Sequence, residues 1–207
     1  MEEISFDGFG LKKNDANVTE KRNVYIGGSD VPTLLGINKY KNQFELAQEK
    51  AGIVQRPFIS NPYIQFGNLL EPDIREYINL MNGLDFVVET YVNEEKRIRS
   101  NVDGIDKENN ILLEIKTHGV RPTIKVYEAQ MQLYMDQIGC DYGWLAMYQR
   151  PKDMNTDFNK DYLSIREIER DETLIGTIHE EIERFWRKLA IMKEFPKMTE
   201  EEWEALN

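Results

Sequence analysis

Hydrophobic and polar residues alternate with two different periods along this chain, and the changes of period separate predicted helices from predicted strands. Tyr127, Met131, Tyr134 and Ile138 recur at the spacing of one helix face, and Gly139 follows as a stop. Similar patterns predict three further helices, over residues 43–51, 71–81 and 175–192. Gly52 and Gly83 end the first two of these.

Other segments are typical of strands, because they are short, rich in β-branched or aromatic residues, and bounded by polar turns. The predicted strands are 86–92, 96–102, 111–117, 143–149 and 162–166, the last of them as an edge strand. Helices and strands in this order predict an α/β (α+β) fold, in which a mixed central sheet is flanked by helices. We expect one layered domain over residues 1–207, with a loose arm at 1–18, a core at 19–192 and a C-terminal tail at 193–207.

A short helix is also predicted to begin at Ser29 and Asp30. Ser29 is a suitable N-cap, Pro32 falls in the tolerant first turn, and Gly36 would end the helix.

A pair of strands around the polar turn 106–110 carries an unusual set of charges. Glu114 and Lys116 alternate with apolar neighbours, so both point to one face of their strand. If the turn forms a hairpin, Asp103 lies directly across from Glu114, with Cβ atoms roughly 5 Å apart. Two carboxylates that close repel each other unless a cation lies between them. A divalent metal held by Asp and Glu beside a Lys is an arrangement that hydrolyses phosphodiesters. The alternative is a solvated sheet face with a weak surface ion pair.

Composition limits the classes of function that this chain can have. Hydrophobic residues make up 41% and charged residues 30%, and no apolar run is long enough for a membrane span. The net charge of −11 argues against a general nucleic-acid coat, although an enzyme can confine its cations to one groove. The acid-rich stretches 167–183 and 200–204 are expected to be solvated helix faces. One cysteine excludes an internal disulfide and a four-cysteine metal site, and the N-terminus lacks a signal peptide, so we expect a cytoplasmic protein.

Several motifs, in this order, resemble the lambda-exonuclease and YqaJ-type viral recombinase family of the PD-(D/E)xK nuclease superfamily. The matching segments follow Arg22 and are IGGSDV at 26–31, FGNLLEP at 66–72, SNVDG at 100–104, LEIK at 113–116, YEAQMQ at 127–132 and IERDE at 168–172. The resemblance covers about residues 22–192. One departure is Val102, which stands where the superfamily name has Pro. The family resemblance implies that the mixed central sheet is of the restriction-endonuclease-like type.

The resemblance also implies roles for particular residues in a two-metal hydrolysis. Asp103 would bridge two Mg²⁺ ions, with Mn²⁺ as a possible substitute, and Glu114 with the backbone carbonyl of Ile115 would complete one site. Glu71 would reach the second ion through water, against the alternative of a helix-start carboxylate. Lys116 would deprotonate the attacking water or stabilise negative charge, and the sequence leaves both roles open.

The helix motif contains two glutamines, of which only one can face the acids. Gln130 and Gln132 lie about 200° apart around an ideal helix, and the spacing from Tyr127 assigns Gln130 to the site. Arg22 and Ser29 are seven residues apart, as in the family pocket for a terminal 5′-phosphate. The alternatives are a surface cation and a plain N-cap.

The function implied by the resemblance is that of a Mg²⁺-dependent 5′-to-3′ exodeoxyribonuclease. It would act on linear double-stranded DNA ends and leave 3′ overhangs for a single-strand annealing protein, in the bacterial host cytoplasm and encoded by a phage or prophage. Family members that act processively are trimers, so a homo-trimer is expected. An endonuclease or repair exonuclease of the same fold, or a catalytically silent DNA-end-binding recombination module, remains an alternative.

Overall fold

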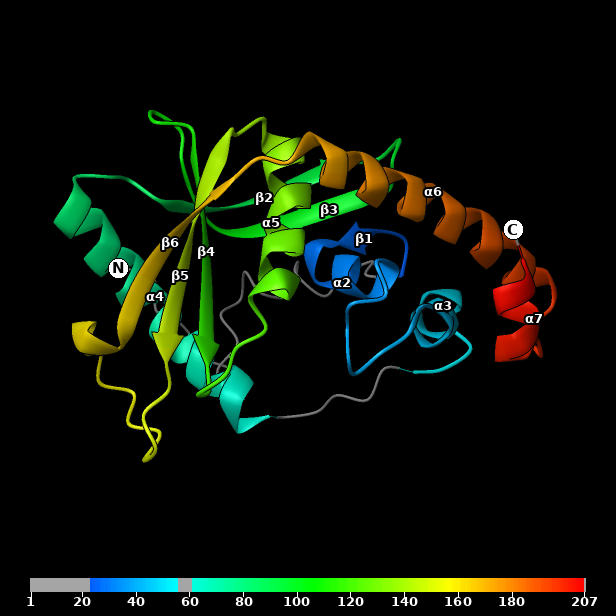
Figure 1. The fold of residues 1–207 in the computed structure, drawn as a ribbon, viewed down its shortest axis with the longest axis horizontal. Coiled ribbons are helices and arrows are strands. Elements are labelled where there is room, and N and C mark those ends of the chain that lie inside the picture. Colours follow the sequence, from blue (N-terminus) through cyan, green and yellow to red (C-terminus); the bar gives the residue numbers. More distant parts are fainter. Residues whose placement is uncertain (1–22, 56–60, 207) are drawn as a thin grey trace, which may run out of the picture.

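The computed structural model describes residues 23–55 and 61–206, and its centre is a six-stranded mixed sheet flanked by helices (Figure 1). This confirms the predicted fold class. The strands are β1 Ile26–Gly27, β2 Val87–Asn93, β3 Ile98–Asp106, β4 Ile111–His118, β5 Tyr142–Gln149 and β6 Leu163–Glu169. β6 lies at one end of the order β1-β3-β4-β5-β6, as predicted for an edge strand. β4 and β5 run parallel, whereas β3 and β4 form an antiparallel hairpin around the expected polar turn.

Three of the helices end where their glycines predict. The helices are α2 Val31–Leu34, α3 Gln43–Ala51, α4 Pro62–Asn82, α5 Ile124–Ile138, α6 Glu172–Glu194 and α7 Glu200–Ala205. Gly52, Gly83 and Gly139 have φ angles of 76°, 65° and 82°, and each donates its N–H to a carbonyl of the preceding turn. These left-handed conformations suit a residue without a side chain, so the glycines stop α3, α4 and α5.

Helix α4 begins at Pro62, well before the predicted start at residue 71. Asn61 caps it by accepting the N–H of Tyr63 at 2.8 Å. Pro72 lies inside the helix, where proline removes a backbone hydrogen bond. The apolar contacts of Phe66 and Leu70 hold the helix together across this interruption, which local pattern alone does not predict.

The short helix predicted from Ser29 is wrong in its first turn. A 3-10 turn, η1, spans Gly28–Asp30, and α2 starts only at Val31. Ser29 makes no side-chain cap, the N-cap residue of α2 is Asp30, and the Asp30 carboxylate accepts the N–H of Gly27 at 3.0 Å. Lys50 fixes that carboxylate at 2.7 Å, so the turn is anchored to α3.

The edges of β3 explain where the fold leaves room for a site. β2 pairs with β3 along one edge, reaching Arg99 and Ile105. On the opposite edge, Arg99 pairs with Gly27 of β1, and Ile105 pairs with Leu112 of β4. β1 and β4 therefore share one edge of β3, one beyond the other. Residues 100–103 lie between them, and no strand of the described residues pairs with that edge.

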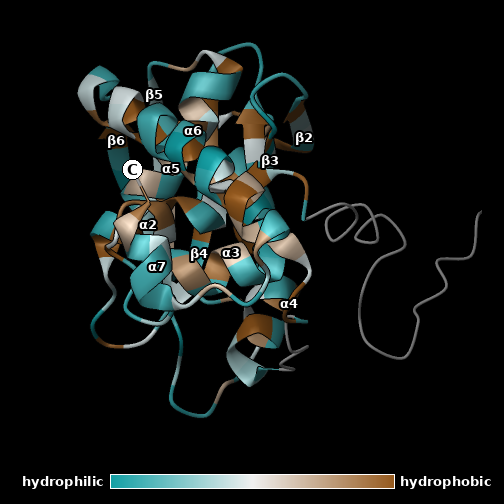
Figure 2. Ribbon diagram, turned by 90° about the vertical axis from the view of Figure 1, so that its right-hand side faces the viewer, coloured by the Kyte–Doolittle hydropathy of each residue, from teal (hydrophilic) through white to brown (hydrophobic). Residues whose placement is uncertain are grey.

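Helices cover both faces of the sheet. Ile111, Leu113 and Ile115 of β4 pack with α4, whereas Leu112 points to the other face and packs in a cluster with residues of α5. A third cluster joins α2, α3, α6 and α7. In Figure 2, α3 and α6 carry both hydrophilic and hydrophobic residues, as expected for helices that each bury one face.

The C-terminal segment is packed, where the sequence predicted a tail. Trp203 of α7 is buried and contacts the rings of Phe44 and Phe185. Thr199 and Glu202 cap α7 reciprocally, which accounts for a helix of six residues in an acidic stretch. Across the two described ranges, the longest apolar helical stretches fall short of what a bilayer crossing requires.

Gly104 lies where the strand pair is most crowded, and we predict that Gly104→Ala destabilises the protein by about 1–3 kcal/mol. An added Cβ would lie 2.9 Å from the Cβ of Phe86 and 3.1 Å from that of Leu113. The matched control is Gly176→Ala in α6, where no atom lies within 4 Å and where alanine should add about 0.5–1 kcal/mol. Urea unfolding of both variants measures the difference, and a neutral Gly104→Ala would contradict the packing described for this strand pair.

Candidate active site

The two strands of the hairpin separate at the position of the candidate acids. Gly104 and Leu113 form the last pair of the β3–β4 ladder on this side. Beyond it, the N–H of Ile115 donates to Asp103 Oδ2 at 2.8 Å. The hairpin pattern predicted that Asp103 and Glu114 would lie directly across from each other in the ladder. This prediction is wrong, because the ladder ends one pair earlier. The Asp103 carboxylate instead accepts a backbone donor that a strand partner would otherwise bind.

Glu114 is the most deeply buried acid of the site, with 1% of its surface exposed. Its Oε1 forms an ion pair with Lys116 and accepts a hydrogen bond from Gln130 Nε2 at 2.7 Å. Its Oε2 is also buried, and no donor among the described residues reaches it. A buried carboxylate oxygen without a partner is costly, so this oxygen has room for a ligand that the protein itself does not supply.

The two glutamines of α5 face different surroundings. Gln130 Nε2 contacts Glu114 and also Tyr134 Oη at 3.0 Å, whereas Gln132 donates to the carbonyl of Glu169 at 2.8 Å. Gln132 also accepts the N–H of Asp171 at 2.8 Å and so joins the end of β6 to α6. The structure thus brings Gln130 to the acids and keeps Gln132 away from them.

Glu71 approaches the site from α4. Arg75, one turn later, donates to Glu71 Oε1 at 3.1 Å and to the backbone carbonyl of Asp103 at 2.7 Å. One guanidinium thus ties the helix to the strand at the point where the ladder opens. Sequence reasoning missed Arg75, although its spacing of four residues from Glu71 is a signal for a helix-surface pair.

The three acids disfavour one another's charge. Burial and the neighbouring Asp103 carboxylate raise the pKa of Glu114 to about 8, although Lys116 opposes the rise. The same two causes raise the pKa of Glu71 to about 7, opposed by Arg75 and Lys116. Burial raises the pKa of Asp103 as well. A group of acids in this state favours any added positive charge.

Lys116 supplies positive charge from the protein itself. Burial alone would lower its pKa, but Glu114 and Asp103 together hold the pKa of Lys116 above its ordinary value. The two histidines lie elsewhere. His118 contacts the carbonyl of Gly119, and His179 is half-buried against Asp136 at 2.7 Å.

A cavity of about 230 Å³ extends from Asp103 to the η1 turn. Its lining brings Ser29 together with Asp103 and Gln130. The remaining lining residues are Tyr25, Gly27, Gly28, Asp30, Lys50, Arg99, Asn101 and Tyr134. Arg22, the predicted partner of Ser29, lies outside the described residues.

The side chains of the site offer oxygen donors for a divalent metal. Among the described residues, no three His, Cys, Asp or Glu side chains form a ready-made cluster. Asp103 and Glu114 are nevertheless oxygen donors of the kind that Mg²⁺ takes, and this ion keeps several waters in place of protein ligands. The partnerless Glu114 Oε2 and the raised pKa values fit an added cation, so the site suits an open metal centre.

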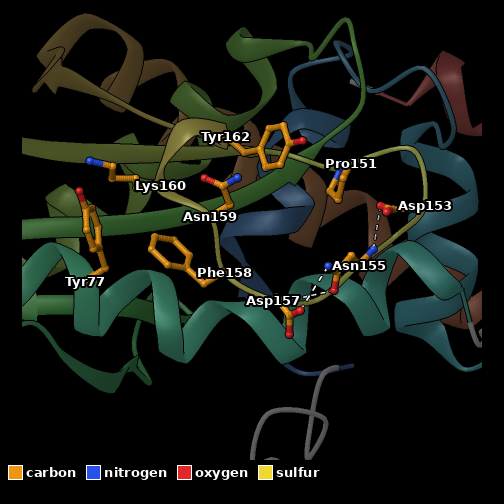
Figure 3. Close-up of a pocket in the computed structure, with 9 residues that line it drawn as sticks. All are labelled: Tyr77, Pro151, Asp153, Asn155, Asp157, Phe158, Asn159, Lys160 and Tyr162. Carbon is orange, nitrogen blue, oxygen red and sulfur yellow. Dashed lines mark hydrogen bonds between the residues drawn. The ribbon is translucent and has the colours of Figure 1, made fainter.

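A second cavity, of about 530 Å³, lies beside the loop that follows β5 (Figure 3). Tyr77 and Phe158 form an aromatic pair on its wall. Asn155 is bonded to both Asp153 and Asp157, so the polar side chains of this loop mainly hold the loop itself. None of the sequence-predicted site residues in the described ranges lines this cavity.

Comparison with known proteins gives one family match. A model described as YqaJ-like viral recombinase domain matches residues 19–148, a range that contains all the predicted site residues. Among curated proteins, the uncharacterized protein YqaJ of Bacillus subtilis (strain 168) is 28% identical over 178 residues. The match covers 84% of this chain but 56% of that protein, so the chain spans about half the length of this relative.

Solved structures show the same fold. The crystal structure of LHK-Exo in complex with dAMP, an alkaline exonuclease from Laribacter hongkongensis, has a TM-score of 0.68 and 23% identity, over 86% of this chain and 94% of that one. A phage related exonuclease from Haemophilus somnus 129PT has a TM-score of 0.66 and 19% identity, over 83% and 96%. At these identities the likeness concerns the fold.

The raised pKa of Glu114 predicts a pH dependence of stability without added metal. In the folded protein Glu114 keeps its proton up to about pH 8, whereas its ordinary pKa is 4.5. The unfolded chain therefore releases this proton first, and the free energy of unfolding should fall as pH rises from about 4.5 to 8.

We expect Glu114→Gln to flatten that fall by on the order of 1–3 kcal/mol, because the amide does not titrate. Thermal unfolding in EDTA across this pH range measures the effect. Glu167→Gln, on an exposed position of β6, is the control. Parallel pH profiles for wild type and Glu114→Gln would contradict the prediction, because they would show that ionisation of Glu114 does not lower the free energy of unfolding.

Proposed function

The chain belongs to the YqaJ-like viral recombinase family, and from this premise we propose that it is a Mg²⁺-dependent exodeoxyribonuclease acting on double-stranded DNA ends. The observation that carries the proposal is the buried Glu114, whose Oε2 has no donor among the described residues and whose Oε1 pairs with Lys116. A structural carboxylate would be saturated with donors. An acid held beside Asp103 with one oxygen open suits the binding of a cation.

Asp103, Glu114 and the carbonyl of Ile115 would hold the metal, with Glu71 assisting at a second ion. When bound, the ions supply a Lewis acid for the phosphodiester and lower the pKa of water. The protein's own part is orientation. The N–H of Ile115 fixes Asp103 Oδ2, and Gln130 fixes Glu114 Oε1, so each acid presents its other oxygen in a set direction.

We assign Lys116 the role of a cation. Its contact with Glu114 and the neighbouring Asp103 holds its proton, and an ammonium group in this position can donate to the phosphate oxygens as negative charge develops. Of the two roles that the sequence left open, the proposal therefore takes stabilisation of negative charge and not deprotonation of the attacking water.

The cavity between the acids and Ser29 suits the end of a DNA strand. We propose that a terminal 5′-phosphate enters it, with Arg22 as a second contact from the undescribed N-terminal segment. Digestion from such an end runs 5′ to 3′ and leaves a 3′ overhang, the substrate of a single-strand annealing protein. By its family, the chain is proposed to work as a homo-trimer.

Asp103→Ala and Lys116→Ala should each lower the rate of linear-duplex digestion by at least about 10³-fold, because the first removes a proposed metal ligand and the second removes the ammonium group proposed to stabilise the phosphate. Both variants should stay folded, since neither side chain belongs to the apolar clusters. The matched control is Lys107→Ala, on the exposed turn of the same hairpin. An active Lys116→Ala enzyme would refute the role assigned to this lysine.

The type of nuclease is tested with linear and circular duplexes in Mg²⁺ buffer. We expect that only linear DNA is degraded, and faster with a 5′-phosphate than with a 5′-hydroxyl. The release of acid-soluble nucleotides measures the rate. Cutting of closed circles would replace the proposal with an endonuclease. Binding of ends without any digestion would replace it with a silent recombination module.

A further inference from the structure

Asp103 lies where both strands beside β3 leave it without a regular partner. The β3–β4 ladder ends before Asp103. On the other side, the pairing with β2 shifts between Val87 and Glu89, so that Val88 alone faces both Asp103 and Gly104. A bulge of this kind takes a residue out of the ladder, and bulges are common beside active sites. The backbone of Asp103 therefore needs a partner from outside the sheet.

Arg75 of α4 is that partner. Its Nη1 donates to the backbone carbonyl of Asp103 at 2.7 Å and to Glu71 Oε1 at 3.1 Å. The side chain of Arg75 is 15% exposed and that of Glu71 is 32% exposed, so the ion pair lies at the edge of the site, where Glu71 can exchange its partner. The contact with the main chain does not involve Glu71, and it would hold the guanidinium in place during such an exchange.

The contact with Arg75 uses an oxygen of the acid that is proposed to assist at a second divalent ion. Glu71 Oε1 has to leave the guanidinium before it can serve a metal. Two cations beside one carboxylate also repel each other. Arg75 and the second ion are therefore alternatives for the same oxygen.

The charges of the site balance with one divalent ion and not with two. The acids are Glu71, Asp103 and Glu114, and the cations that act on them are Lys116 and Arg75. With all three acids ionised, this set carries one negative charge. One divalent cation and one phosphodiester together make it neutral, whereas a second divalent cation adds positive charge that nothing in the set offsets. Burial makes such an imbalance more costly, because charges interact more strongly away from water.

We propose that Arg75 is a positioning residue that occupies Glu71 in place of the second divalent ion. Without DNA, the site then takes one ion tightly, and it takes a second ion only when that ion displaces Arg75 from Glu71. This proposal rests on the proposed nuclease function and deepens it, because it names the protein group that controls how the metal centre fills.

The test is a titration of the DNA-free protein with Mn²⁺, in which electron paramagnetic resonance counts free and bound ions. Arg75→Met removes the charge and keeps the length of the side chain, and we expect it to tighten the weaker of the two sites at least about tenfold while the tighter site changes less. Arg75→Lys keeps the charge without the planar fork, so the expected tightening is intermediate. Arg187→Met is the matched control, since Arg187 and Glu183 have the same spacing in α6 but are 64% and 76% exposed.

The variant Glu71→Gln separates the release of Glu71 from a general effect of charge. If Arg75 acts by holding Glu71, the double variant Glu71→Gln/Arg75→Met should bind the second ion no more tightly than Glu71→Gln alone. Equal tightening with and without Glu71 would overturn the proposal. A purely structural role for Arg75 predicts the opposite sign in the single variant, because a loosened site binds both ions more weakly.

The proposal also fails if Arg75→Met binds the second ion as wild type does, or more weakly. If Arg75→Met does not fold, as judged by circular dichroism, unchanged binding by Arg75→Lys overturns it instead. Digestion of linear duplex by wild type in Mg²⁺ is measured separately. An active wild type whose Mn²⁺ binding is independent of Arg75 keeps the nuclease and refutes this inference, whereas Arg75-dependent binding without digestion does the reverse. A wild type and variants that all bind no Mn²⁺ refute both.

Discussion

The opening of the β3–β4 ladder is the feature on which the rest of the site depends. Strands normally satisfy their backbone donors with the carbonyls of a neighbour. After Gly104 and Leu113 this supply ends, and the Asp103 carboxylate accepts the N–H of Ile115 instead. The side chain that closes the gap in hydrogen bonding is also the proposed metal ligand. Backbone satisfaction and chemistry therefore hold the same residue in the same place.

The gap would not persist without the elements that surround it. Arg75 binds the carbonyl of Asp103 from α4, and the chain of hydrogen bonds from Tyr134 through Gln130 reaches Glu114 from α5. Tyr134 in turn fills the space above Gly28, where an added Cβ would lie 2.5 Å from the tyrosine ring. Gly28 is required there because any side chain would displace the ring that supports Gln130 and, through it, Glu114. The η1 turn and Glu114 are thus both supported by one tyrosine.

The sequence predicted the parts of this structure that have local causes. Helix stops at Gly52, Gly83 and Gly139 follow from backbone geometry, and the hairpin follows from its polar turn. The contacts that depend on distant segments were not predictable. Arg75 joins a helix to a strand 28 residues away, which no helix periodicity encodes.

The same distinction explains the errors at the first helix and the C-terminus. Ser29 is a good N-cap by composition, but α2 begins one residue later with Asp30 at its N-cap position, and Lys50, 20 residues later, fixes the Asp30 carboxylate. Trp203 packs against rings from α3 and α6, so an acidic stretch that resembled a tail became part of the core. In both cases tertiary contacts decided between local alternatives.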